Sequence, residues 1–254
     1  MHKRVPVIAA NWKMFKTKDE ALEFIFAVNG HMPSTDQVES IICAPAILLN
    51  LLVKREGENL RIAAQNMHYK DEGAFTGENS PAQVKTAGAE YILIGHSERR
   101  NIFNETDEEV NLKMHAAFKY DLAPILCIGE ELDVRESNQT KQVLDNQLEI
   151  AFKNVTKEQA LKTIVAYEPV WAIGTGKTAT PQMANETIKD VRSKLAHLYG
   201  NEVAMQIRIL YGGSVKTDNI EALLEESDID GALIGGAALD HNNFLKFVEA
   251  AKNK

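Results

Sequence analysis

Eight short apolar runs, separated by amphipathic segments, constrain the fold of this 254-residue chain more than any other feature. Most of the runs are apolar throughout and do not alternate with polar residues. That pattern is typical of strands buried on both faces of a parallel sheet. We therefore expect eight parallel strands, at Val5–Ala10, Val38–Ala44, Leu60–Ala64, Tyr91–Ile94, Leu122–Ile128, Thr163–Tyr167, Ile207–Tyr211 and Gly231–Ile234.

Helix signals lie between these runs. Thr17 and Glu20 form a capping-box pair, Thr106 and Glu109 form another, and apolar residues with helical spacing follow each pair. Proline at the first helical position marks two more helix starts, at Ser80-Pro81 and Thr180-Pro181. Apolar residues with the same spacing predict further helices around residues 144–152, 220–224 and 240–248.

The alternation of strand and helix predicts an α/β protein with a parallel sheet. Eight such units in about 250 residues is the size of a (β/α)8 barrel, and a doubly wound open sheet is the structural alternative. The sequence contains no Gly/Ser/Pro-rich linker and no low-complexity tract. We therefore predict a single (β/α)8 barrel domain over residues 1–254, with eight parallel strands.

Composition excludes several classes of function. The net charge of −8 and the pI near 5.5 argue against a nucleic-acid binder, which needs a basic face. No apolar run approaches 18 residues, so we expect no membrane span. The two cysteines, Cys43 and Cys127, are too few for a disulfide framework, and no pair of histidines has zinc-ligand spacing with a third ligand. We expect a cytoplasmic protein without a metal or another cofactor.

In a barrel, catalytic groups sit at the carboxyl ends of the strands. Reading those ends gives a carboxylate, an imidazole, a lysine and two glycine pairs, a set suited to acid–base chemistry on a small anion. The strand-end residues are Asn11, Lys13, Gln65, His96, Ser97, Glu98, Cys127, Glu130, Glu168, Gly212-Gly213-Ser214 and Gly235-Gly236.

The glycine pairs after the last two strands predict a phosphate site. Glycine lets backbone N–H groups approach an anion closely, and phosphate sites after strands seven and eight recur in barrels. Tight-turn glycines without a ligand are the alternative for either pair alone; two pairs at successive strands favour the anion site. Lys13 is the cation that a phosphorylated substrate needs, although most lysines are solvated surface charges. A lone histidine such as His96 is likewise more often structural than catalytic.

Glu168, together with the segment that follows it, is the most specific functional signal in the sequence. A carboxylate at the end of an apolar strand is costly unless it is paired or used in chemistry. The residues after it, Pro169 to Thr180, look like a hinged lid with apolar residues at its tip and glycines at one end. Gly174-Thr-Gly-Lys177 resembles part of a phosphate-binding P-loop, but Trp171 stands where that motif needs its first glycine. A salt-bridged surface loop is the alternative.

Taken together, these motifs resemble the triosephosphate isomerase family, in family order from residue 5 to about residue 250. The stretch Tyr167–Lys177 is specific by itself. The loop Asn66–Asn79 contains a segment, Gly73–Glu78, that resembles the family's dimer-interface loop. The other matching motifs are Asn11–Met14, Gly95–Arg100, Cys127–Glu130, Tyr211–Val215 and Ile234–Ala237.

The resemblance implies interconversion of dihydroxyacetone phosphate and glyceraldehyde 3-phosphate through an enediolate, in glycolysis and gluconeogenesis. Glu168 matches the base and His96 the electrophile, which in this family is a neutral imidazole whose pKa a helix N-terminus lowers. Lys13 and Asn11 match groups that stabilise developing negative charge. The remaining matches are Gly174, Ser214, Gly235 and Gly236 as phosphate-binding positions, and Ser97, Glu98 and Cys127 as supporting residues.

The resemblance also implies a homodimer in which Phe75, Thr76 and Gly77 insert near Lys13 of the partner. Departures from the family pattern, among them Ala10, Phe15, Asn79 and Asn104, fall outside the catalytic positions. Two alternatives stay open. A phosphosugar lyase or aldolase would share the glycines but needs a Schiff-base lysine or a metal. A non-enzymatic relative is expected to have lost Lys13, His96 or Glu168, and this chain has all three.

Overall fold

The computed structural model describes residues 4–172 and 179–254, and within them eight strands close into a parallel barrel. Every strand pairs with its neighbours in sequence, and β8 pairs with β1, with Val7 opposite Gly231. The strands are β1 (Val7–Asn11), β2 (Glu39–Ala44), β3 (Leu60–Ala64), β4 (Tyr91–Ile94), β5 (Ala123–Ile128), β6 (Ile164–Tyr167), β7 (Ile209–Tyr211) and β8 (Gly231–Ile234).

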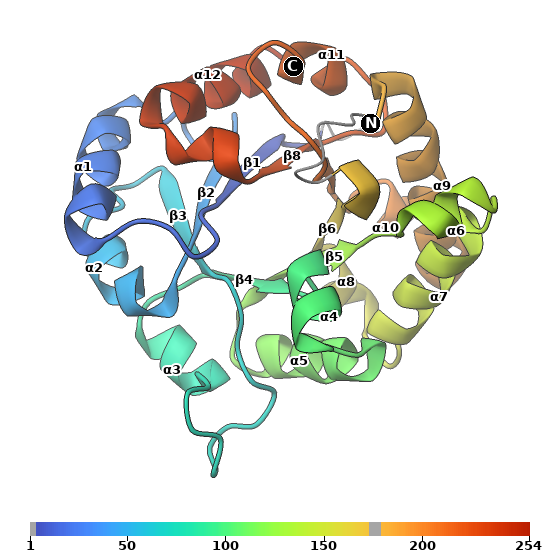
Figure 1. Ribbon diagram of the computed structural model, residues 1–254, viewed down its shortest axis with the longest axis horizontal. Coiled ribbons are helices and arrows are strands. Elements are labelled where there is room, and N and C mark those ends of the chain that lie inside the picture. The colour runs from blue at the N-terminus through green and yellow to red at the C-terminus, as the bar shows by residue number, and fades with distance from the viewer. Residues whose placement is uncertain (1–3, 173–178) are drawn as a thin grey trace.

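Helices form a ring around this barrel (Figure 1). The longer ones are α1 (Lys18–Val28), α5 (Asp107–Lys119), α7 (Thr140–Ala151), α9 (Pro181–Tyr199) and α12 (His241–Lys252). The shorter ones are α2 (Leu49–Val53), α3 (Pro81–Thr86), α4 (Ser97–Phe103), α6 (Leu132–Glu136), α8 (Lys157–Leu161), α10 (Asn201–Ala204) and α11 (Ile220–Leu224). Single 3-10 turns are η1 (Asn29–His31), η2 (Ala46–Leu48), η3 (Val170–Ala172) and η4 (Gly236–Leu239).

The predicted (β/α)8 barrel is therefore confirmed, and the open sheet is excluded. All eight apolar runs contain a strand, and three strands, β3, β4 and β8, have the predicted bounds. The other five start one or two residues later than predicted. Among these, β1 begins at Val7, after Pro6, a residue that has no N–H to give to a ladder.

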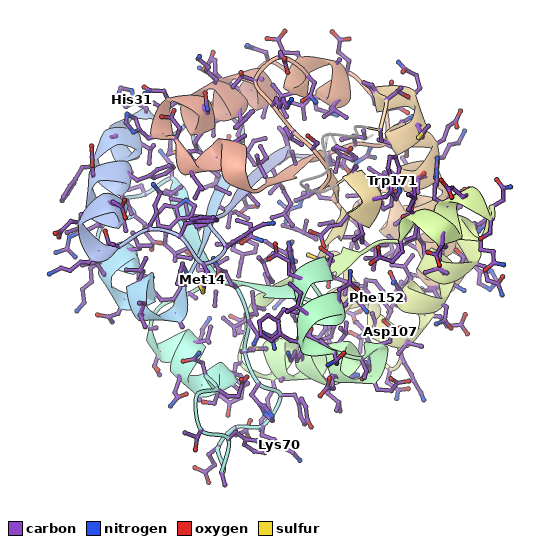
Figure 2. All side chains as sticks on the ribbon, in the orientation of Figure 1. Met14, His31, Lys70, Asp107, Phe152 and Trp171 are labelled. Atoms are coloured by element: carbon purple, nitrogen blue, oxygen red, sulfur yellow. The ribbon has the colours of Figure 1, made fainter. Side chains whose placement is uncertain are left out.

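The barrel has two apolar layers, because alternate residues of each strand face opposite sides. Val7 and Ala9 of β1 point into the barrel interior, where they meet Ile41 and Cys43 of β2. Ile8 and Ala10 instead belong to the layer between the barrel and the helices. Both faces of each strand are thus buried, which explains why the runs are apolar throughout. Figure 2 shows side chains filling both layers.

The capping signals in the sequence correctly predicted where several helices begin. Thr17, Ser80 and Thr106 each form a complete capping box, and Thr180 and Asp240 cap the two long helices near the end of the chain. The shorter helices α2, α4, α6, α8 and α10 were not predicted. The loop Asn66–Asn79 contains no helix or strand, and in Figure 1 it projects away from the barrel between β3 and α3.

Candidate active site

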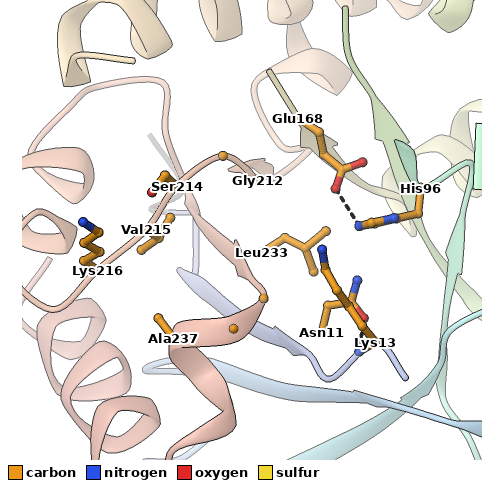
Figure 3. Close-up of a pocket in the computed structure, with 13 residues that line it drawn as sticks. Asn11, Lys13, His96, Glu168, Gly212, Ser214, Val215, Lys216, Leu233 and Ala237 are labelled. Carbon is orange, nitrogen blue, oxygen red and sulfur yellow. Dashed lines mark hydrogen bonds and ion pairs between the residues drawn. The ribbon is translucent and has the colours of Figure 1, made fainter. Parts of the chain in front are cut away.

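A pocket of about 270 Å³ opens at the carboxyl ends of the strands and gathers most of the predicted site residues (Figure 3). These residues come from segments far apart in sequence, which the barrel brings to one end. The pocket is lined by Asn11, Lys13, His96, Glu168, Gly212, Gly213, Ser214, Val215, Lys216, Leu233, Gly235, Gly236 and Ala237. Ser97 and Glu98 adjoin it, and Gly174 lies outside the described residues.

The turn after β1 fixes Lys13 at the edge of this pocket. Lys13 has a φ of +50°, and its N–H donates to Asn11 Oδ1 at 3.0 Å. Gln65, at the end of β3, donates from Nε2 to the carbonyls of Lys13 and Cys43 at 2.8 and 2.9 Å. Gln65 was noted as a strand-end residue, but its part in holding this turn could not be read from the sequence.

Glu98 neutralises Lys13 in the structure. The Nζ of Lys13 lies 2.5 Å from Glu98 Oε1, and both side chains are partly exposed. A pair with this exposure is only weakly stabilising and exchanges readily with another anion. The ammonium group is therefore held at the pocket and remains available to a substrate.

His96 and Glu168 face each other inside the pocket. Nε2 of His96 lies 2.9 Å from Glu168 Oε1, and Ser97 N–H donates to Glu168 Oε2 at 3.0 Å. His96 also caps α4, because Glu98 N–H donates to its Nδ1 at 3.2 Å. Since Nδ1 accepts a hydrogen bond, the neutral ring carries its proton on Nε2 and points it at Glu168 and the pocket.

Electrostatics favours an ionised Glu168. Complete burial raises the pKa of this carboxyl group, but the adjacent His96, the Ser97 N–H and Lys13 outweigh burial and lower its pKa below 4.5. For His96 the expected direction of the pKa shift, a lowering, is wrong in this arrangement. Burial lowers the pKa of the imidazole, but the Glu168 carboxylate outweighs burial and raises it. The helix N-terminus alone therefore does not set the pKa of His96 while Glu168 touches it.

The glycines at the strand ends are needed for two different structural reasons. A Cβ on Gly212 would lie 2.9 Å from Glu168 Cγ, and one on Gly213 would lie 2.3 Å from Tyr211 Oη. Those two glycines are required by close packing. A Cβ on Gly235 would enter the pocket 3.3 Å from Lys13 Cε, and one on Gly236 would meet no atom within 4 Å. Gly235 and Gly236, at the start of η4, thus leave open space for an anion.

A buried ion cluster holds the end of β4, from which His96 extends. Glu105 is 6% exposed and accepts hydrogen bonds from Gly95 N–H at 3.0 Å, Arg99 Nε at 2.7 Å and Lys113 Nζ at 2.6 Å. On the other side, Arg100 Nε donates to the Gly95 carbonyl at 2.7 Å. Nothing in the sequence pattern marked Glu105, which follows the unpredicted helix α4.

Glu130 anchors the chain just after Glu168. Its Oε1 accepts hydrogen bonds from Tyr167 Oη and Trp171 Nε1, both at 3.0 Å, and burial raises its pKa. The predicted lid begins at this point, and its central residues 173–178 lie outside the described part of the chain. Cys127 is buried in the barrel interior, where burial and the nearby Glu168 raise its pKa, so its thiol stays protonated.

The described residues contain no cluster of three or more His, Cys, Asp or Glu side chains able to hold a metal ion. None of the helices found in residues 4–172 and 179–254 is long and apolar enough to cross a membrane.

Comparison with known families supports the assignment that this geometry suggests. The sequence model of the triosephosphate isomerase family matches residues 6–251, nearly the whole chain. The match covers all eight strands and every residue of the pocket. The chain belongs to the triosephosphate isomerase family.

Proposed function

We propose that this chain interconverts dihydroxyacetone phosphate and glyceraldehyde 3-phosphate with Glu168 as the base, His96 as the electrophile and Lys13 with Asn11 as the groups that bind negative charge. The reaction itself follows from the family. The observation that carries the residue assignment is the contact between an ionised Glu168 and the proton-bearing Nε2 of His96 at the wall of one pocket.

The proton movement follows from these positions. With the ketone bound, a Glu168 oxygen takes a proton from the carbon that bears the hydroxyl group, and the electron pair forms the double bond of the enediolate. Negative charge then develops on the former carbonyl oxygen, where the Nε2 proton of His96 and the Lys13 ammonium stabilise it. His96 Nε2 gives its proton to this oxygen and takes the hydroxyl proton from the neighbouring oxygen, so that the negative charge passes from one oxygen to the other. Glu168 then returns its proton to the former carbonyl carbon, which yields the aldehyde and restores both the carboxylate and the neutral imidazole.

The pKa of His96 is coupled to this step. In the structure the Glu168 carboxylate raises that pKa. Once Glu168 has accepted the substrate's proton it carries no charge, and burial together with the Glu98 N–H at Nδ1 then favours neutral imidazole. A neutral donor matches the family pattern and is available when the enediolate forms.

The phosphate group is proposed to lie between the Ser214 turn and Gly235-Gly236, with Gly174 as a further contact from outside the described residues. Figure 3 shows Ser214 and Ala237 toward the other end of the pocket from Glu168 and His96. This separation supports an arrangement in which the reacting carbons lie beside the base and the phosphate lies beside the glycines. A Schiff-base aldolase is disfavoured, because the Nζ of Lys13 is engaged in an ion pair with Glu98 Oε1 at 2.5 Å, whereas a Schiff-base lysine needs a free amine.

The proposal is tested by assaying the purified chain in both directions with coupled dehydrogenases, and by running the reaction in D2O. We expect interconversion and deuterium in the product at the carbon that receives the proton. Turnover without solvent deuterium in the product under any condition would support direct hydride transfer and contradict the proposal. Trapping of a substrate adduct by borohydride would favour the aldolase.

We further propose that the chain acts in the cytoplasm as a homodimer through the loop Asn66–Asn79, with Phe75, Thr76 and Gly77 near Lys13 of the partner. Phe75 is 41% exposed on the projecting loop, where it stacks on His68 at 4.1 Å. Next to Lys13, Met14 is 95% exposed. Exposed apolar side chains at both places favour burial against a second copy. Sedimentation at micromolar concentration should show about twice 28.2 kDa, and a purely monomeric species contradicts the dimer.

A further inference from the structure

The pocket contains a second lysine that the catalytic assignment does not use. Lys216 follows the Ser214 turn and lines the same pocket as Lys13 and Glu168. Figure 3 shows it at the far end of the pocket from His96 and Glu168, beyond Ser214 and Val215. It therefore stands on the side where the phosphate is proposed to bind.

Lys216 differs from Lys13 in that its charge is not neutralised. The Lys13 ammonium is paired with Glu98 at 2.5 Å. Within the part of the chain that the structure describes, the ammonium of Lys216 makes no hydrogen bond or ion pair, and its side chain is exposed. Its full positive charge thus acts on whatever enters the pocket.

The backbone that carries Lys216 is fixed. Asn219 accepts a hydrogen bond from the Lys216 N–H at 2.8 Å and donates one to the Ser214 carbonyl at 3.1 Å. Between them, Val215 is buried at 5% exposure. The turn that presents Ser214 to the pocket therefore also holds Lys216 at its rim, while the lysine side chain remains free to move.

The position of the Lys216 charge affects how a phosphorylated substrate approaches the protein. The protein has a net charge of −8 and repels a phosphate dianion as it approaches. A local unpaired cation at the mouth of a pocket offsets this repulsion over about one Debye length, roughly 10 Å at 0.1 M salt. An exposed, mobile side chain adds little to the affinity of a bound ligand, but it does raise the rate of encounter.

We propose that Lys216 is a positioning residue that attracts the substrate phosphate into the pocket and acts on capture, not on the proton transfer. This inference rests on the proposed function, because it takes the substrate to be a phosphorylated triose bound at Ser214, Gly235 and Gly236. It assigns the rim of the phosphate site a group that acts at a distance and is distinct from those that touch the reacting carbons.

The test compares Lys216→Gln with Lys54→Gln in the full-length protein at low ionic strength. Both changes lower the net charge from −8 to −9. Lys54 is exposed and follows α2, at the opposite end of the barrel from the pocket. We expect Lys216→Gln to lower kcat/KM about 2- to 5-fold through KM, with kcat unchanged, and Lys54→Gln to have no such effect.

Two further readouts separate electrostatic capture from a structural role. The loss should shrink toward zero as salt is raised to about 0.5 M, where charges a few ångströms apart are already screened. Inhibition by inorganic phosphate, which reports affinity at equilibrium, should weaken by a smaller factor than kcat/KM, and Lys216→Arg should restore kcat/KM. An unchanged kcat/KM at low salt in Lys216→Gln, a loss that persists at high salt, or a loss in kcat alone would each overturn the inference. An inactive wild-type protein would instead contradict the proposed function.

Discussion

Glu168 Oε1 lies 2.9 Å from His96 Nε2, although β6 and β4, the strands that present these residues, are separated in the barrel by β5. The two groups proposed to act on different atoms of the substrate are thus in direct contact with each other. A substrate has to break this contact and replace it on both sides. The contact between Glu168 and His96 therefore holds both side chains in place, and substrate binding exchanges it for contacts with the substrate.

The first prediction concerns the open space at Gly235. A Cβ at this position would lie 3.3 Å from Lys13 Cε and project into the pocket. Gly235→Ala should displace the ammonium group and crowd the phosphate, lowering kcat/KM by about 10-fold or more, because small misplacements at a reacting centre are costly. Steady-state kinetics measures this.

Gly30→Ala is the matched control, since a Cβ at Gly30 meets nothing within 4 Å and the residue lies outside the pocket. Its kinetics should equal those of the wild type. Equal kinetics for both variants would show that Gly235 does not border the substrate.

The second prediction concerns Arg192 of α9, which forms ion pairs with two aspartates just before β8. Arg192 is 5% exposed and lies 2.8 Å from both Asp228 Oδ1 and Asp230 Oδ2. Among the residues that the structure describes, Arg192→Met leaves Asp230 with Arg4 as its one ion-pair partner. We expect the free energy of unfolding to fall by about 3–5 kcal/mol, with kcat per folded molecule unchanged.

Urea denaturation and active-site-normalised kinetics check both parts of this prediction. Asp230→Asn should partly rescue Arg192→Met, because it removes the carboxylate that was left undercompensated. Strictly additive effects in the double variant would show that the two groups are not coupled.

The third prediction concerns the pH dependence of stability. Burial, aided by Glu90, raises the pKa of Glu56 to about 7, and its Oε2 has no hydrogen-bond partner in the described structure. The folded state therefore binds a proton that the unfolded state, with a carboxyl pKa of 4.5, has already released. Glu56 then destabilises the fold progressively as the pH rises from about 4.5 to 7.

Glu56→Gln should remove this component of the pH dependence and raise the free energy of unfolding at pH 8 by about 1 kcal/mol, since partial exposure screens the charge. Denaturation at pH 5 and pH 8 measures the effect. Glu58→Gln, at an exposed neighbouring position, is the control and should be neutral. A gain for Glu56→Gln that is the same at both pH values would rule out titration of Glu56 as the cause.

Much of the fold could be predicted because its signals are local. The capping box of Thr17 with Glu20 and the uninterrupted apolar run at β3 each depend on residues close in sequence. Helix α4 was missed because its N-cap is His96, a residue type that rarely caps helices. Helix α8 was missed although Thr156 and Gln159 form a readable capping box.

The candidate site could be predicted as a set of strand ends but not as a set of contacts. Parallel strands of a barrel bring their carboxyl ends together, so the identity of the pocket residues follows from the pattern. The pairs inside it do not follow. Lys13 meets Glu98 across 85 positions, and Gln65 reaches the carbonyl of Lys13 across 52. Such contacts depend on strand register and turn geometry, which periodicity leaves undetermined.

The kcat of Glu168→Gln tests the central claim most directly. The amide is nearly isosteric and can still accept the Ser97 N–H, so the barrel should fold with an unchanged thermal transition. The amide cannot accept a proton from carbon, and we predict that kcat falls about 10²- to 10⁴-fold, the usual contribution of a general base. A folded Glu168→Gln protein that turns over at a rate near that of the wild type would contradict the account.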